Sequence, residues 1–172
     1  MGNAMKVKTV VESLESSKEF QAWRAKDKDS FLVHLFMIVD KENIKWHVGY
    51  CNKKDKITTF DIAEKIHVHA PEKAFKKPGS KIQKLDLAAV KLDIADVLER
   101  IHRLQQEKYS AELPVRKIVI LQHIDEGQVY NVTYVTAGLK TLTVKLDAAS
   151  GEIKAEQLQS MFTFTGKDIT KQ

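Results

Sequence analysis

The second half of this chain resembles the first at an offset of 84 residues. At that offset residues 46–50 (WHVGY) align with residues 130–134 (YNVTY), and one extra residue of offset upstream aligns Asp40 with Asp125. A repeat of this length constrains the architecture before any local prediction is made, because each copy is expected to form one structural unit. The chain is therefore expected to contain two similar units.

Size and composition indicate that the two units depend on each other. Each unit would contain about 65–80 residues, which is marginal for an independent core. A hydrophobic content of 43% is sufficient for a core, and 30% charged residues provide a well-solvated surface. We therefore expect the units to share a core or to pack tightly.

The first half has the pattern of a helix followed by strands. Apolar residues recur at helical spacing from Val7 to Trp23. Residues 16–19 (SSKE) match a capping box, so the helix is expected to break and restart there. Three segments rich in β-formers follow and predict strands joined by short turns: 31–39, 44–51 and 56–62.

The second half repeats this order after an irregular stretch. Residues 82–87 predict either a short strand or the lead-in to a helix, and Asp93 is a suitable N-cap for a helix over 94–104. Four strands are then predicted, at residues 115–124, 129–136, 142–146 and 152–164. Because consecutive strands are joined by short turns, we expect antiparallel meanders.

The predicted fold class is therefore α+β, with two similar units that each pack a helix on an antiparallel meander of three or four strands. The parts, in chain order, are a cloning remnant (1–4), the first helix-plus-sheet unit (5–70), a connector containing Lys and Pro (71–90), the second unit (91–164) and a polar tail (165–172).

A turn near the end of the second half carries a family resemblance. The strand in residues 143–147 (TVKLD) runs into residues 148–153 (AASGEI), so that Asp147 and Gly151 frame a tight turn. Asp can bond to its own backbone ahead, and Gly takes the positive φ that closes the hairpin. Together with residues 130–134, this pattern resembles the PepSY domain over roughly residues 92–153. The first half shares the element order without this turn, and a cystatin-like helix-on-sheet fold gives the same pattern.

The resemblance implies an interaction module. PepSY domains occur in protease propeptides and cell-envelope proteins, with proposed inhibitory or chaperoning roles. We therefore expect a non-enzymatic protein that binds a protein or peptide, through a sheet edge or the groove between the units, and that can form a homodimer through an edge strand. No catalytic residue, cofactor or metal site is expected.

Two alternatives remain open. The first is nonspecific nucleic-acid binding, because the net charge is +5 and a Lys-rich connector surrounds Phe75. Its candidate contact residues are Lys73, Lys76, Lys77, Lys81 and Lys84. The second is a small-ligand carrier or an enzyme with a pocket between helix and sheet.

Histidines and the single cysteine are the other candidates for chemistry. His67 and His69 alternate on an extended segment, and His34 and His47 lie on neighbouring predicted strands. This spacing is compatible with a zinc site and equally with solvated histidines. Cys51 lies beside lysines that would favour a thiolate, but it aligns with a valine, which favours a packing role.

The sequence also predicts a location. One cysteine excludes an intramolecular disulfide, and no apolar run approaches the roughly 18–20 residues of a membrane span. No signal peptide precedes the first apolar pattern. We expect a cytoplasmic protein without a membrane partner, an expectation that a removed leader would change.

Overall fold

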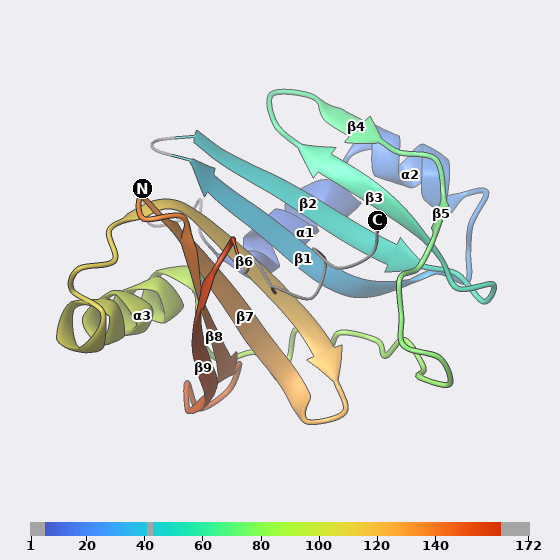
Figure 1. The fold of residues 1–172 in the computed structure, drawn as a ribbon. Coiled ribbons are helices and arrows are strands. Elements are labelled where there is room, and N and C mark those ends of the chain that lie inside the picture. Colours follow the sequence, from blue (N-terminus) through green and yellow to red (C-terminus); the bar gives the residue numbers. More distant parts are fainter. Residues whose placement is uncertain (1–5, 41–42, 163–172) are drawn as a thin grey trace, which may run out of the picture.

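Residues 6–40 and 43–162 are described by the computed structural model. The expected cloning remnant and tail, and the predicted end of the last strand at residue 164, lie outside these residues. The described strands form one nine-stranded antiparallel sheet in the order β4-β3-β2-β1-β6-β7-β8-β9, with β5 paired to β3 (Figure 1). The fold is therefore α+β, as predicted, and both halves of the chain contribute to a single sheet.

The helices are α1 (Val7–Glu15), α2 (Lys18–Arg24) and α3 (Ile94–Lys108). The strands of the first half are β1 (Phe31–Asp40), β2 (Asn43–Cys51), β3 (Lys56–Ile62), β4 (Ile66–Val68) and β5 (Glu72–Lys73). Those of the second half are β6 (Pro114–Ile124), β7 (Gly127–Thr136), β8 (Lys140–Asp147) and β9 (Ile153–Ser160).

Local capping explains where the helices begin. The Ser17 side chain accepts a hydrogen bond from the Phe20 N–H at 3.2 Å, so the break between α1 and α2 occurs at the predicted serines. Asp93 begins α3, and the Asp96 carboxylate returns a bond to the Asp93 N–H at 3.2 Å. None of the helices among the described residues has the length and apolar character needed to cross a membrane.

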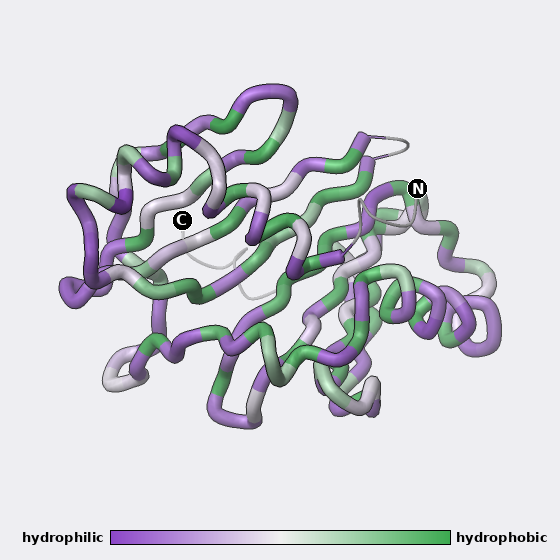
Figure 2. The backbone as a smooth tube through the Cα atoms, turned by 180° about the vertical axis from the view of Figure 1, so that it is seen from behind, coloured by the Kyte–Doolittle hydropathy of each residue, from purple (hydrophilic) through white to green (hydrophobic). Residues whose placement is uncertain are grey.

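The helices cover one face of the sheet, and alternate residues of every long strand point to that face. Figure 2 shows the corresponding alternation of hydrophobic and hydrophilic residues along the strands. The buried side chains of all three helices belong to one core cluster that spans both halves. The residues expected to lie beneath the helices are all buried: Trp46, Val48, Tyr130, Val132 and Leu146.

Equivalent strands begin at a constant spacing along the chain. β2 and β7 begin 84 residues apart, as do β3 and β8. Leu35 and Met37 on β1 face the core, as do Val119 and Leu121 on β6, also 84 residues apart. The extra residue of offset expected upstream is therefore wrong. It would turn every side chain of the strand to the opposite face, because side chains alternate with a period of two.

The halves are joined by pairing of β1 with β6. Leu35 lies opposite Leu121 and Met37 opposite Val119, and all four side chains are buried. The centre of the shared core is therefore built from both halves. We call this pairing the seam.

The connector crosses the end of the seam and is tied to both halves. The Leu85 N–H donates to the Leu32 carbonyl at 2.9 Å, and the Tyr130 hydroxyl donates to the Leu92 carbonyl at 2.7 Å. Residues 82–87 form no strand, so the lead-in alternative is the one observed. β5 adds to the sheet of the first half within the stretch expected to be connector.

Because the halves share a core, damage in one half should unfold the other. Leu121→Ala removes a fully buried side chain at the seam and should lower the free energy of unfolding by about 2–5 kcal/mol. Both tryptophans, Trp23 and Trp46, lie in the first half. Their fluorescence and far-UV circular dichroism should report the same lowered urea midpoint.

Leu139→Ala is the control, because Leu139 is 52% exposed and its loss should change stability by less than about 0.5 kcal/mol. A tryptophan transition that Leu121→Ala leaves unchanged would show that the halves unfold independently.

Candidate functional site

The face of the sheet opposite the helices carries a cluster of histidines around one carboxylate. Asp61 on β3 lies directly opposite His47 on β2, and its Oδ1 is bonded to His47 Nδ1. The other oxygen, Oδ2, lies 2.8 Å from Nε2 of His69. His67, opposite Asp61 on β4, stacks edge-on against His69 with ring centroids 4.7 Å apart.

The two imidazoles determine the state of Asp61. Burial alone would raise the pKa of this carboxyl, but the hydrogen bonds from His69 and His47 overcome that effect and hold its pKa below the usual range. An ionised Asp61 accepts from both rings. Its partners are therefore oriented with His47 Nε2 and His69 Nδ1 left available to other groups.

His34 completes the cluster from β1, and a glycine makes room for it. A Cβ atom built on Gly49 would lie 2.5 Å from the His34 ring, so the ring rests on the backbone of β2. Burial, and secondarily the nearby His47, lower the pKa of His34. The ring is therefore kept neutral at pH 7.

These side chains line a groove that the connector covers. A cavity of about 400 Å³ is lined by His34, His47, Asp61 and His69 below and by residues 70–75 above. A second cavity of about 400 Å³ shares His34 and Phe75 with the first and continues beneath the connector to Lys145. We call the combined cavity the histidine groove. Its volume is in the range of small-ligand sites.

The structure separates the chemical alternatives raised by the sequence. Within residues 6–40 and 43–162, no set of three or more His, Cys, Asp and Glu side chains is arranged to hold a metal ion. The four histidines do meet, but Asp61 engages two of them. Cys51 is buried, and burial together with Asp55 raises the pKa of its thiol, which disfavours a nucleophile.

The five predicted contact lysines do not form one site. Lys73 lies on β5, Lys76 pairs with Asp55 at 2.7 Å, and Lys77 and Lys81 line the far part of the histidine groove. Lys84 instead lines a separate cavity beside α1. The connector therefore presents four of these lysines on the open-face side, and the fifth near the helices.

The cavity beside α1 is the pocket between helix and sheet that one alternative requires. It has a volume of about 760 Å³. Its main polar groups already have partners: the Tyr50 hydroxyl donates to Glu15 Oε1 at 2.7 Å, and Arg24 donates to the Ser30 carbonyl at 2.7 Å. Burial and the bond to Glu15 raise the pKa of Tyr50, so it remains a neutral donor. These paired groups favour a structural role.

The second candidate region is the open edge of the sheet. β9 is an eight-residue strand that pairs with β8 on one side only, within the described chain. The opposite edge is short, because β4 has three residues and β5 two. A long unpaired edge presents backbone donors and acceptors to other chains.

Strand pairing brings together residues that local sequence patterns could not associate. His47 and Asp61 are far apart in the chain, and only their register across β2 and β3 makes them neighbours. The alternation of apolar and polar residues places both on the open face. That alternation was the available signal, but it cannot specify which strands pair.

No protein-family model matches the sequence, and no curated protein matches it. The crystal structure of a candidate lipoprotein from Clostridium difficile 630 is similar in fold, with a TM-score of 0.52 and 13% sequence identity. The match covers 82% of this chain and 90% of that one. At this identity the likeness concerns the fold alone.

The neutral His34 should make stability depend on pH. Its pKa is lower folded than unfolded, so this contribution is fully present above the unfolded value of about 6.5 and is lost as the pH falls through it. Urea unfolding at several pH values should show this decline, and His34→Gln should reduce it. A His34 ring that titrates at or above 6.5 by NMR would contradict the assignment.

Gly49→Ala should disturb the cluster directly. The new methyl group overlaps the His34 ring and should cost about 1–3 kcal/mol of unfolding free energy, measured with urea. In the His34→Ala background the same change should cost much less, because the ring is absent. Equal costs in both backgrounds would place the strain elsewhere.

Proposed function

We propose that this protein is a non-enzymatic binding module that pairs a β-strand of another polypeptide with the edge strand β9. The observation that carries the proposal is the free side of β9, which extends over eight residues. Strand addition uses the backbone for affinity and alternate side chains for specificity.

The backbone of β9 has a defined pattern of free groups. The Met161 N–H donates to the Leu139 carbonyl at 2.9 Å, and residues 140–145 and 160–155 continue in register from this pair. Because N–H groups alternate in direction along an antiparallel strand, those of Glu156, Leu158 and Ser160 point away from β8. These three residues would pair with an added strand.

The side chains around β9 indicate what such a strand would meet. On the helix side, Glu156 is held by Lys108 at 2.9 Å and by the Tyr109 hydroxyl at 3.1 Å, which fixes β9 against α3. At the strand's end, three exposed apolar side chains lie close together: Leu139, Met161 and Phe162. An extended peptide with an apolar residue at that end is the favoured partner.

A second copy of the chain is one such partner. Two β9 strands related by a two-fold axis would pair antiparallel and join two sheets into one. This arrangement corresponds to the homodimer expected from the sequence.

We further infer that both halves derive from one PepSY-like unit by tandem duplication. The constant spacing of the strand starts supports this inference, as does the shared order of helix and four-stranded meander. The turn behind the resemblance has the required geometry. Asp147 Oδ1 accepts from the N–H groups of Ala149 at 2.9 Å and Ser150 at 2.8 Å, and Gly151 has a φ of +75°.

Strand addition should protect a specific set of amides. In the free protein at low concentration, the amides of Glu156, Leu158 and Ser160 should exchange rapidly with deuterium, whereas those of Gln157 and Gln159 are protected by β8. A peptide selected for binding from an extended-peptide library, or self-association at high concentration, should slow exchange at the first set. NMR-detected hydrogen exchange measures both sets.

Proline substitution provides the functional test. Leu158→Pro removes an outward N–H and should abolish peptide binding or dimerisation while the sheet stays folded. Leu158→Ala controls for lost packing and should retain association. Peptide binding or dimerisation that survives Leu158→Pro, or that protects no amide of β9, would exclude strand addition at this edge.

A further inference from the structure

One end of the sheet, opposite in strand order to β9, concentrates positive charge. Three segments meet there: the loop 25–30 after α2, the turn 52–56 between β2 and β3, and the segment 72–77 that contains β5. Lys53 bonds to Asp29 at 2.9 Å, and the Ala74 N–H donates to the Asp55 carbonyl at 2.8 Å. We call these three segments the basic end.

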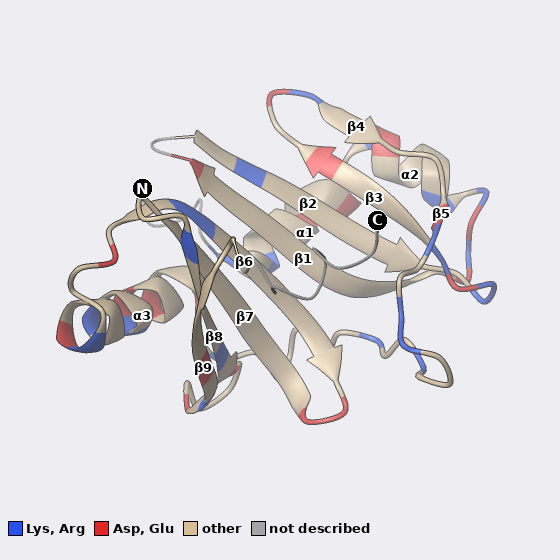
Figure 3. Cartoon of the chain, viewed as in Figure 1, with Lys and Arg blue, Asp and Glu red and all other residues tan. Residues whose placement is uncertain are grey.

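Lysines outnumber acids two to one in the basic end. Its three segments contain eight lysines and four acidic residues, a net charge of +4 (Figure 3). The lysines are Lys26, Lys28, Lys53, Lys54, Lys56, Lys73, Lys76 and Lys77. Most of the chain's net charge of +5 therefore equals the charge of this one surface.

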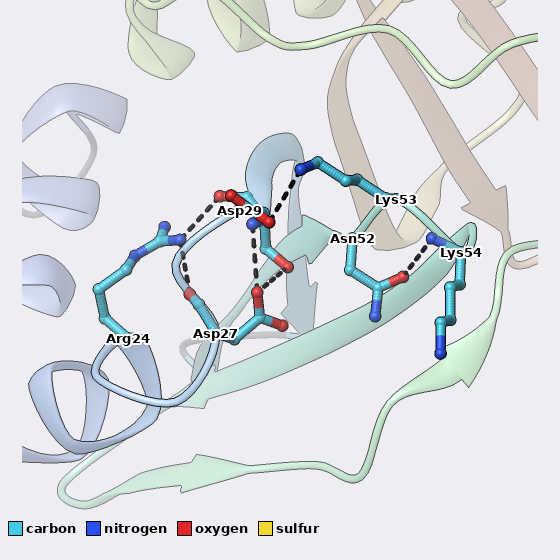
Figure 4. Close-up of polar contacts among 7 residues, drawn as sticks. Arg24, Asp27, Asp29, Asn52, Lys53 and Lys54 are labelled. Carbon is cyan, nitrogen blue, oxygen red and sulfur yellow. Dashed lines mark hydrogen bonds and ion pairs between the residues drawn. The ribbon is translucent and has the colours of Figure 1, made fainter.

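Three of the four acids are already engaged within the protein. Asp29 pairs with Lys53, and Asp27 Oδ1 accepts from the Ser30 hydroxyl at 2.7 Å, which shapes the loop (Figure 4). Asp55 pairs with Lys76 at 2.7 Å. The remaining lysines of the surface outnumber the one remaining acid, Glu72, so the surface stays attractive to anions.

Two lysines face each other across the sheet in this region. Lys56 on β3 lies directly opposite Lys73 on β5. Like charges directly opposite on paired strands are unfavourable, and a bound anion relieves the repulsion. This pair makes the surface more suited to an anionic partner than scattered lysines would be.

Phe75 projects from the middle of this charge. Its side chain is fully exposed, the most exposed of the large hydrophobic residues. It lies between Lys73 and the pair Lys76 and Lys77. Lysines surrounding an exposed aromatic side chain are typical of segments that insert into the headgroup region of a lipid bilayer.

We propose that the basic end docks on an anionic lipid surface, with Phe75 inserted among the headgroups and the lysines contacting lipid phosphates and carboxylates. Lipid fits better than a nucleic acid, because single-stranded nucleic acid sites stack successive bases on several aromatics. Here the sheet aromatics Trp46, Tyr50, Tyr130 and Tyr134 are buried. The basic end also contains no arginine, the residue favoured for base and phosphate recognition.

This surface is independent of the edge strand, because β9 and β3–β4 lie at opposite ends of the strand order. The sequence-based expectation of no membrane partner rested on the lack of a spanning segment. Peripheral docking requires no such segment.

Vesicle cosedimentation tests the proposal with the full chain. The protein should bind vesicles of mixed phosphatidylcholine and phosphatidylserine, and should not bind vesicles of phosphatidylcholine alone. Binding should weaken as salt is raised, because the attraction is screened. Phe75→Ala should weaken binding about tenfold. Phe162→Ala, which removes an exposed phenylalanine outside the basic end, should leave binding unchanged.

The charge component has its own matched pair of variants. Lys73→Glu with Lys77→Glu should reduce vesicle binding at least about tenfold. Lys8→Glu with Lys45→Glu makes the same change in net charge at exposed positions outside the basic end and should have a much smaller effect. Equal unfolding midpoints would confirm that both double variants are folded.

Insertion is measured separately by fluorescence. Phe75→Trp should add an emission component that shifts to the blue on addition of phosphatidylserine vesicles. The proposal is overturned if both vesicle types bind equally or neither binds at low salt, or if Phe75→Ala behaves like Phe162→Ala. Salt-sensitive binding of a single-stranded oligonucleotide without vesicle binding would assign the surface to nucleic acid instead.

Discussion

The pairing of β1 with β6 is the interaction on which the rest of this structure depends. It converts two small meanders into one sheet, and it places Leu35, Met37, Val119 and Leu121 at the centre of a shared core. Neither half alone has the size to bury such a core well. Because this pairing occupies one edge of each meander, it also determines which edges remain: the short β4–β5 edge and the long β9 edge.

The two faces of the sheet have separate roles. The helices and the apolar residues of every long strand provide stability on one face. The other face can therefore carry groups that a core would exclude, including the histidines around Asp61. That cluster depends on Gly49, since any side chain there would overlap His34. The connector that covers this groove continues into Phe75 and its lysines, so the groove and the basic end share one segment of chain.

Much of the local structure could be predicted from the sequence. The break at Ser17, the cap at Asp93 and the burial of Trp46 and Tyr130 follow from hydrogen-bonding side chains and from periodicity, which are short-range properties. The extra residue of offset upstream was wrong because the alignment matched similar letters without asking which face they occupy. The candidate lysines were only a part of the basic end, because Lys26, Lys28 and Lys53 come from segments distant in the chain.

The sequence by itself determined the order of the elements, the antiparallel character of each meander and the side chains that enter the core. These features follow from alternation, turn residues and caps, which act over a few residues. Only the tertiary structure decided that the two halves form one sheet, that His47, Asp61 and His69 meet, and that three lysine-bearing segments converge. The physical reason is that strand pairing joins residues far apart in the chain, and edge strands with similar alternation can pair in many ways until one arrangement buries the shared core.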